Sequence, residues 1–250
     1  MFVASGPPHR YLKKMIVLPK RNIVQRALNR ALYRFGIRPF PIRFESSLPE
    51  AGADAATVFN AVYATDYWGT LETKSGGGST IEATAQYVQQ LIAAINELGV
   101  KSMFDAPCGD LNWMHRVITQ TGVAYRGGDI ASEAVELALR RHPNVSLFDI
   151  CADRFPSADL WHCRDTFFHL GFADIRRALA KARESDIEYA AITTHRARWL
   201  KNVDIKTGGF RLLDLERPPF NFPRAIRYLR DYPPQQFPRF VGIWRMSDLS

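Results

Sequence analysis

The segment Met103-Phe104-Asp105-Ala106-Pro107-Cys108-Gly109-Asp110 decides the fold class of this chain. An apolar strand pattern runs into a turn of small residues, and an acid stands at each end of that turn. Asp129, about twenty residues beyond the turn, ends a second predicted strand, and nucleotide-binding α/β folds place a carboxylate on ribose hydroxyls at this spacing. A turn with a carboxylate on each side fits a cationic ligand that carries a ribose better than it fits a pyrophosphate.

A regular alternation of strand and helix patterns begins at residue 100. Strands are predicted at residues 101–105, 124–129, 145–148, 159–163 and 188–193, and helices at 111–121, 131–141 and 171–184. Such alternation is typical of a parallel sheet with helices on both faces and right-handed crossovers. Residues 210–215 and 240–245 read as two more strands with a short basic helix between them. We therefore predict an α/β fold: a Rossmann-like, doubly wound, mostly parallel seven-stranded sheet with an antiparallel closing strand and an N-terminal helical extension.

Charge and proline content divide the chain into three parts. Residues 1–50 form a basic helical extension and linker, residues 51–99 a helical segment that covers cofactor or substrate, and residues 100–250 the core, with a substrate insertion at about 195–235. The net charge is +8, and residues 1–43 contain no acid. An amphipathic basic helix predicted over 21–35 either packs on the core with a solvated face or contacts an anionic membrane or a lipid-linked substrate.

Cysteine usage and hydropathy point to a cytoplasmic protein. The three cysteines lack the CxxC spacing of zinc sites and are too few for a disulfide framework. No apolar run approaches the roughly 20 residues of a membrane span, and the N-terminus lacks the apolar core of a signal peptide. Peripheral attachment to a membrane through the basic N-terminus stays open.

An acid ends or closely follows each of the first four predicted parallel strands: Asp105, Asp129, Asp149 and Asp165. Ligands of open α/β sheets bind beyond these carboxyl ends. The series resembles the class I S-adenosylmethionine-dependent methyltransferases, most clearly over residues 100–195. The family's first motif usually has several glycines, where this chain has Gly109 alone.

Three further stretches carry this resemblance. The DAPCGD form followed by Trp113-Met114 resembles a bacterial subset of the family, as does Tyr67-Trp68-Gly69 with the Ser75–Ser79 loop. Residues 163–170 are similar to the family's fourth-strand motif, which commonly ends in His-Leu. The resemblance implies an enzyme that uses S-adenosylmethionine.

The resemblance also implies roles at the methionine end of the cofactor. Asp105 would hold its ammonium group, and Gly109 would let the backbone approach closely. Cys163 and Arg164 would line the cofactor near the sulfonium. The predicted set on this side is completed by Ala106, Pro107 and Trp68.

At the nucleoside end, the resemblance places Asp129 on both ribose hydroxyls, since an ionised carboxylate can accept from two donors. Ile130 would pack on the adenine face. Asp149 would accept from the adenine amino group, with the backbone of Ile150 assisting.

Methyl transfer to a hydroxyl needs alignment with the sulfonium and a base that takes the proton. The candidates are Asp165, His169 and His195, the last in a loop expected to face substrate. Each also has a simpler interpretation: Asp165 as a cap, His169 as a loop anchor and His195 as part of a solvated basic loop. No metal site is assigned, although Asp165, Asp204 and Asp214 are acids that could hold Mg²⁺.

The acceptor is predicted to be a saccharide or glycan-like molecule. Flat and polar side chains mix on the predicted substrate side: Tyr67, Trp68, Trp199, Phe210, Phe220, Phe222, Asn202, Asp204, Arg211 and Asn221. One alternative acceptor is a small natural product or amine. Alternatives of another class are a nucleic-acid-binding protein, suggested by the charge, and a cofactor-binding protein without catalysis. Nucleic-acid methylation is disfavoured because no Asn/Asp-Pro-Pro-Tyr/Phe tetrad follows the fourth strand, and a dehydrogenase because a proline stands in the first turn. The sequence does not indicate the oligomeric state.

Overall fold

A computed structural model describes residues 43–44, 53–196, 200–231 and 238–249. The contacts of the chain divide it into Met1–Pro39 and Phe40–Ser250, and every described residue belongs to the second unit. The basic helix predicted over 21–35 therefore lies outside the described residues. Among the described residues, no helix combines the length and the hydropathy needed to cross a membrane.

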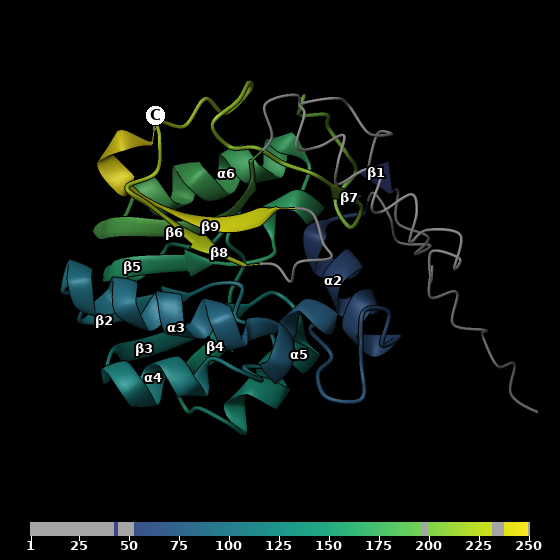
Figure 1. Ribbon diagram of the computed structural model, residues 1–250. Helices are drawn as coiled ribbons and strands as arrows, with labels where there is room; N and C mark the ends of the chain where they lie inside the picture. The colour runs from purple at the N-terminus through teal and green to yellow at the C-terminus, as the bar shows by residue number, and fades with distance from the viewer. Residues whose placement is uncertain (1–42, 45–52, 197–199, 232–237, 250) are drawn as a thin grey trace, which may run out of the picture. The chain divides into compact units, whose positions relative to one another are not determined.

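Strands and helices alternate through the described core (Figure 1). The strands are β1 Arg43–Phe44, β2 Ser102–Asp105, β3 Ala124–Asp129, β4 Val145–Leu147, β5 Ala158–Cys163, β6 Ile187–His195, β7 Phe210–Arg211, β8 Arg227–Arg230 and β9 Arg239–Arg245. The helices are α2 Ala55–Ala64, α3 Ile81–Leu98, α4 His115–Thr121, α5 Ser132–Leu139 and α6 Phe172–Arg183, with short 3₁₀ turns η1 Gly77–Ser79, η2 Phe167–His169 and η3 Met246–Asp248.

The central sheet has seven strands in the order β4-β3-β2-β5-β6-β9-β8. The strands from β4 to β6 pair in parallel, whereas β9 runs antiparallel to both of its neighbours, β6 and β8. The predicted doubly wound, mostly parallel sheet with an antiparallel strand is therefore confirmed. The order reverses between β2 and β5, so a crevice for ligands is expected at their carboxyl ends.

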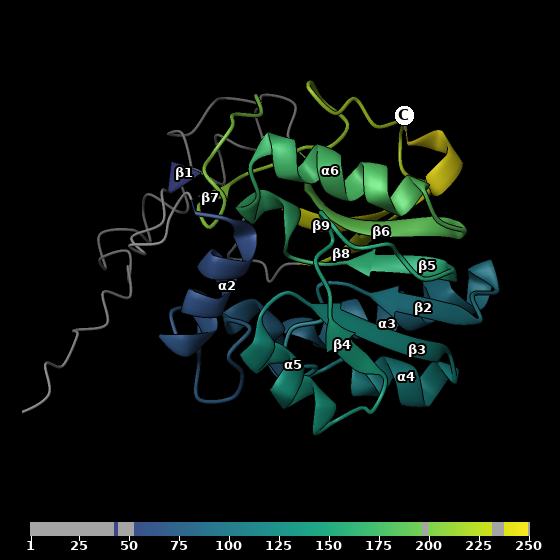
Figure 2. The same cartoon turned by 180° about the vertical axis from the view of Figure 1, so that it is seen from behind.

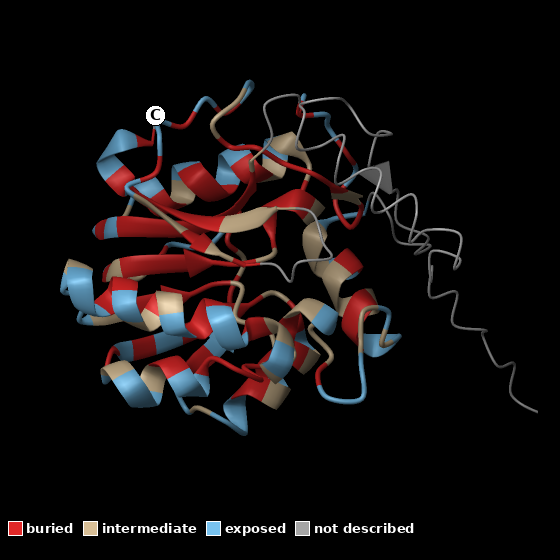
Figure 3. Cartoon of the chain, in the orientation of Figure 1, coloured by how far each residue is buried: buried red, intermediate tan, exposed pale blue. Residues whose placement is uncertain are grey.

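Alternate residues of each strand point to opposite faces and build two cores. Met103 of β2 and Leu160 of β5 pack with α3, α4 and α5, whereas Phe104 and Trp161 pack with α6. Figure 2, seen from behind, shows α6 against the sheet. In Figure 3, buried residues follow the strands and the inner sides of the helices. The two apolar layers hold the strand ends, and the side chains on them, in fixed relative positions.

Two predictions in the C-terminal part are wrong. The short basic helix expected around 224–230 is instead the edge strand β8, because Leu229 is buried against β9 while the arginines beside it stay partly exposed. The strand expected over 210–215 does not join the central sheet. Only Phe210 and Arg211 pair with another strand, β1. Leu212, Leu213 and Leu215, which follow, are buried but belong to no strand.

Candidate functional site

A cleft opens at the carboxyl ends of β2, β3 and β5, at the point where the strand order reverses. Its empty volume, which includes open solvent at its mouth, is about 910 Å³. Of the predicted cofactor residues, nine line it: Trp68, Asp105, Pro107, Gly109, Asp129, Ile130, Asp149, Ile150 and Arg164.

The turn after β2 forms the floor of the cleft. Ala106 N–H donates to the carbonyl of His162 at 2.9 Å and Cys108 N–H to that of Gly128 at 2.9 Å, so the turn is tied to both neighbouring strands. Gly109 has a φ of 59°, and a Cβ there would lie 2.6 Å from Ser75 Oγ. A side chain at this position would clash with Ser75, in a backbone conformation that favours glycine.

Asp129 joins the end of β3 to this turn. Its Oδ2 accepts from Gly109 N at 2.9 Å and its Oδ1 from Ala131 N at 2.9 Å. Burial raises the pKa of Asp129 to about 6, although the two N–H donors offset part of the rise. Each oxygen can accept one more hydrogen bond, so the carboxylate can take two hydroxyl donors from a ligand in the cleft.

Asp105 is held by a buried polar chain that the sequence analysis missed. Its Oδ1 lies 2.6 Å from His162 Nδ1 and its Oδ2 accepts from the Tyr125 hydroxyl at 2.9 Å. The other ring nitrogen of His162 lies 2.8 Å from the Tyr87 hydroxyl. The register of β2 and β5, which sets Asp105 opposite His162, creates this contact. The sequence contained one sign of this contact, because His162 interrupts an otherwise apolar strand pattern.

The adenine side of the predicted site is apolar with one acid. Ile130, Phe148 and Ile150 line the cleft beside Asp149. Asp149 Oδ1 accepts from Cys151 N at 2.7 Å, which closes the turn after β4 and orients the carboxylate.

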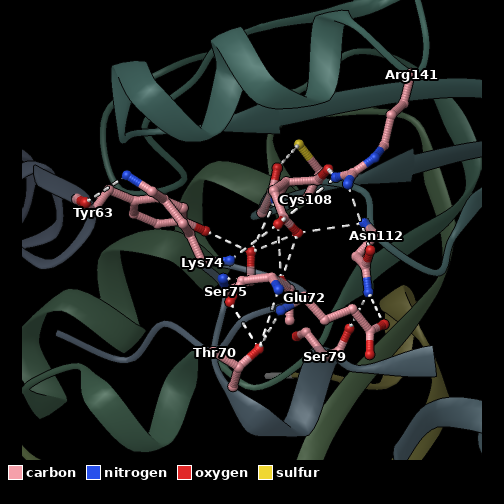
Figure 4. A network of polar contacts seen from close by, with 12 residues as sticks. Tyr63, Thr70, Glu72, Lys74, Ser75, Ser79, Cys108, Asn112 and Arg141 are labelled. Carbon is pink, nitrogen blue, oxygen red and sulfur yellow. Dashed lines mark hydrogen bonds and ion pairs between the residues drawn. The ribbon is translucent and has the colours of Figure 1, made fainter. Parts of the chain in front are cut away.

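Asp110, at the far end of the turn, holds the segment 70–80 against the cleft. Figure 4 shows Thr70, Lys74 and Ser75 of that segment beside Cys108 of the turn. Its carboxylate accepts from Thr73 Oγ1 at 2.8 and 3.0 Å, from Lys74 N at 3.2 Å and from Ser75 Oγ at 3.0 Å. Asp110 N donates back to Ser75 Oγ at 2.9 Å, and Tyr63 hydroxyl lies 2.8 Å from the same oxygen. Ser75 and Ser79 line the cleft, so this segment covers it.

A second contact fixes the base of the same cover. Glu72 Oε1 accepts from Asn112 Nδ2 at 2.6 Å and from Ile81 N at 2.7 Å, and Asn112 Nδ2 also donates to Ser79 O at 3.1 Å. Sequence reasoning identified the Ser75–Ser79 loop but not the side chains that fasten it to the turn, because they lie more than thirty residues away along the chain.

Arg164 and Asp165 sit in a charged cluster at the end of β5. Arg164 Nη2 donates to Gly78 O at 2.9 Å and to Asp231 Oδ1 at 2.8 Å, and Asp165 lies 3.3 Å from Arg164 and 3.4 Å from Arg239. Burial lowers the pKa of Arg164, but Asp165 and Asp231 outweigh it and raise that pKa. Burial raises the pKa of Asp165, but Arg164 and Arg239 hold it below its usual value.

His169 is the candidate base that faces the cleft with a usable lone pair. Its Nδ1 lies 2.7 Å from Gly209 O, and a carbonyl can only accept, so Nδ1 carries the proton. Burial lowers the pKa of His169 to about 4, which leaves the ring neutral near pH 7 with its lone pair on Nε2. The described residues offer Nε2 no hydrogen-bond partner. The ring stacks on Trp68, with centroids 4.6 Å apart.

His195 differs from the prediction. It is the last residue of β6, buried, and absent from the cleft wall. Its N–H donates to Leu213 O at 2.6 Å and its Nδ1 accepts from Leu213 N at 3.2 Å, and burial lowers its pKa to about 3. The expected substrate-facing loop is wrong because β6 extends through this residue to pair with Arg239.

Two predicted cofactor residues also point away from the cleft. Cys163 shares the face of β5 that carries Trp161, so alternation along the strand sends its side chain into the core. Ala106 is fully buried, and its carbonyl accepts from Trp161 Nε1 at 2.9 Å, which makes it a support of the turn.

The predicted acceptor side chains are mostly structural in this arrangement. Phe220 and Phe222 belong to the core, and Trp199 lies outside the described residues. Asn202 donates to the carbonyls of Asp214 and Pro218, at 2.8 and 2.9 Å. Of the predicted acceptor aromatics that the structure describes, Trp68 lines the cleft. Among the described residues, no group of three or more His, Cys, Asp or Glu side chains is placed to hold a metal ion.

Several solved methyltransferases share this architecture. Magnesium protoporphyrin IX methyltransferase (ChlM) from Synechocystis PCC 6803 with bound SAM matches with a TM-score of 0.52 and 14% identity, over 76% of this chain and 96% of that one. Its structure with bound SAH matches with a TM-score of 0.51 and 13% identity, over 76% and 95%.

The methyltransferase domain of bacterial CtHen1-C matches with a TM-score of 0.50 and 14% identity, over 65% of this chain and 98% of that domain. No family model and no curated protein matches the sequence. Likeness at this identity is a likeness of fold. The chain has the fold of the class I S-adenosylmethionine-dependent methyltransferases.

Proposed function

We propose that this chain is an S-adenosylmethionine-dependent methyltransferase whose active site is the cleft between β2 and β5. One observation carries the proposal above the others. The carboxylate of Asp129, at the end of β3, accepts from the backbone of Gly109 in the turn after β2, and both residues line one cleft at the switch point. This arrangement presents an acceptor pair for ribose hydroxyls beside a turn that a ligand can approach.

The residues present fit the cofactor along its length. Asp129 has capacity for two hydroxyl donors, and Ile130 and Asp149 offer an apolar face and a carboxylate for adenine. The backbone of Gly109, which lines the cleft without a side chain, and the carboxylate of Asp105 suit the methionine end, where an ammonium group needs an anion. Solved ChlM with bound SAM and bound SAH supports the same cofactor for this fold.

S-adenosylmethionine supplies a methyl group bonded to positively charged sulfur, which is already electrophilic. The segment held by Asp110 can limit the access of water to a bound ligand, and His162 and Tyr125 fix the direction of the Asp105 carboxylate. His169 can accept a proton at Nε2 from an acceptor hydroxyl as the hydroxyl oxygen attacks. Asp165 is a weaker base, because two arginines stabilise its ionised form.

The acceptor that we propose is a saccharide or glycan-like hydroxyl compound. The support is the pairing of an aromatic ring, Trp68, with a neutral histidine that can take a hydroxyl proton, inside one cleft. A neutral amine could be methylated without that base. We place the reaction in the cytoplasm, supported by three free thiols, with contact between the basic N-terminus and an anionic membrane or lipid-linked acceptor as part of the same proposal.

The test has two stages. Isothermal calorimetry with S-adenosylhomocysteine asks whether the cofactor product binds, and absence of binding would contradict the proposal before any acceptor is known. Transfer of a labelled methyl group is then measured against neutral and charged saccharides, small amines and RNA. Transfer to saccharides supports the proposed acceptor, whereas transfer only to amines or RNA replaces it.

The role of His169 is tested with His169→Gln, which keeps a polar side chain but removes the titratable nitrogen. Arg245→Met is the matched control, because Arg245 is exposed at the opposite end of the sheet, beside Glu188. Loss of transfer in the first variant with unchanged product binding assigns the proton acceptor. Equal turnover in the two variants would remove His169 from the reaction.

A further inference from the structure

Arg211 on β7 is a buried arginine of which only one edge is used. Its side chain is fully buried, and Nη1 donates to Leu170 O at 2.7 Å. Its Cζ lies 5.0 Å from the centroid of the Phe172 ring. Nε and Nη2 have no hydrogen-bond partner. These two atoms form the side edge of the guanidinium, where parallel N–H bonds match the two oxygens of a carboxylate or phosphate.

No acid among the described residues forms an ion pair with Arg211. Asp204 is the acid whose charge acts on it, but Asp204 Oδ1 accepts from Phe172 N at 2.8 Å and Ile205 N at 2.9 Å. Burial lowers the pKa of Arg211 to about 10, so the group is still charged at neutral pH. A buried charge without a counter-ion destabilises a fold, and a sequence that keeps one commonly trades stability for function.

The segment that carries Arg211 also contacts the candidate base, although Arg211 itself does not line the cleft. Leu170, whose carbonyl anchors Arg211, and His169 both line the cleft. Gly209, two residues before Arg211, accepts from His169 Nδ1. The rings of Phe210 and His169 are 5.7 Å apart and partly exposed. The same short backbone segment therefore orients the base and positions the guanidinium.

We propose that Arg211 binds an anionic group of the acceptor, a carboxylate or a phosphate, and so places a hydroxyl of that molecule beside His169. This inference rests on the proposed methyltransferase function and names its substrate class as an anionic saccharide. Because Arg211 is fully covered, the anion reaches it by displacing neighbouring side chains, and the rings of Phe210 and His169 are partly exposed.

Thermal melting of the full chain with three sugars tests the inference. Glucuronate presents a carboxylate, glucose 6-phosphate a phosphate and glucose neither, all at one ionic strength. The wild-type Tm is expected to rise with one or both charged sugars and to stay constant with glucose. The response identifies which oxyanion binds.

Three variants locate the response. Arg211→Met is expected to lose it and, without sugar, to melt about 2–4 °C higher than wild type, because an uncompensated buried charge is removed. Arg211→Lys keeps the charge but lacks the two-donor edge and should bind the anion roughly tenfold more weakly. If Arg211→Met does not fold, the response of Arg211→Lys tests the inference. Arg245→Met, which removes an exposed guanidinium, should respond like wild type.

The inference is overturned if neither charged sugar raises the wild-type Tm. It is also overturned if either Arg211 variant responds as strongly as wild type. S-adenosylhomocysteine affinity is measured in parallel and should be the same in all variants. A loss of that affinity in Arg211→Met would move the residue to the cofactor site and overturn the inference. Failure of the wild-type chain to bind S-adenosylhomocysteine would contradict the proposed function. The thermal shifts with charged sugars would still show whether Arg211 binds an anion.

Discussion

Asp129 should make the affinity for S-adenosylhomocysteine depend on pH. Burial raises the pKa of its carboxyl group to about 6, from 3.8 in an exposed aspartate. The ionised group can accept from two ribose hydroxyls, whereas the protonated group loses one of these acceptors. Binding then requires removal of a proton at low pH. The affinity should therefore be highest above pH 6 and fall as the pH falls through 6.

The magnitude follows from the fraction of ionised carboxylate. If only the ionised form binds, the dissociation constant is nearly unaffected at about pH 7.5 and rises about tenfold at about pH 5, one unit below the pKa. Asp129→Asn removes the charge from the hydrogen bonds to ribose. Its affinity should be lower by roughly 1.5–3 kcal/mol, or roughly 10- to 100-fold, at neutral pH. The pH dependence should disappear in this variant.

Calorimetric titrations between pH 5 and 8 provide the assay. Asp159→Asn is the matched control, because Asp159 accepts from Lys101 N at 2.6 Å and Ser102 N at 2.9 Å, at the amino end of β2, and does not line the cleft. Circular dichroism checks that each variant is folded. A wild-type affinity that stays constant from pH 8 to pH 5 would refute the reasoning. So would an Asp129→Asn variant that binds as tightly as wild type.

Four other predictions use the same contacts. His169→Gln should lower labelled-methyl turnover by about 10²- to 10⁴-fold while leaving product affinity unchanged; a parallel fall in product affinity would contradict a role limited to proton transfer. Asp110→Ala should lower the free energy of unfolding by about 3 kcal/mol in urea titrations, because three donors from the cover lose a charged acceptor. Tyr87→Phe leaves His162 Nε2 without its partner and should cost about 1–2 kcal/mol, read from the urea midpoint. Finally, the free energy of unfolding should fall as the pH drops from 6.5 towards 4, because His169 and His195 stay neutral in the folded chain and bind protons when it unfolds. A urea midpoint that stays constant over that range would argue against this prediction.

Local patterns predicted the core elements well. The strand predicted over 124–129 is β3 with the same bounds, and the strand predicted over 101–105 is β2, Ser102–Asp105. Apolar periodicity, capping residues and turn glycines are properties of neighbouring residues, so they are readable without the fold. The acids at the ends of β2 and β3 were readable for the same reason.

Contacts between distant segments were not predictable in this way. Arg227–Arg230 has a basic composition that favoured a helix, yet pairing with β9 makes it a strand. The contact of Asp105 with His162 was not predicted, because it depends on the β2–β5 register. His169 and His195 looked alike as candidate bases. They differ in the partner of Nδ1. In His169 this nitrogen donates to the carbonyl of Gly209, whereas in His195 it accepts from Leu213 N.

The amino-acid sequence alone determined an α/β core with carboxylates at the rim of a parallel sheet, because strand period, turn residues and strand-end acids are all encoded within a few neighbouring positions. The tertiary structure decided which of those side chains share the cleft, which histidine keeps a lone pair for a ligand, and which loop covers the turn. Those outcomes depend on strand register and on burial, and both arise from segments that meet only when the chain is folded.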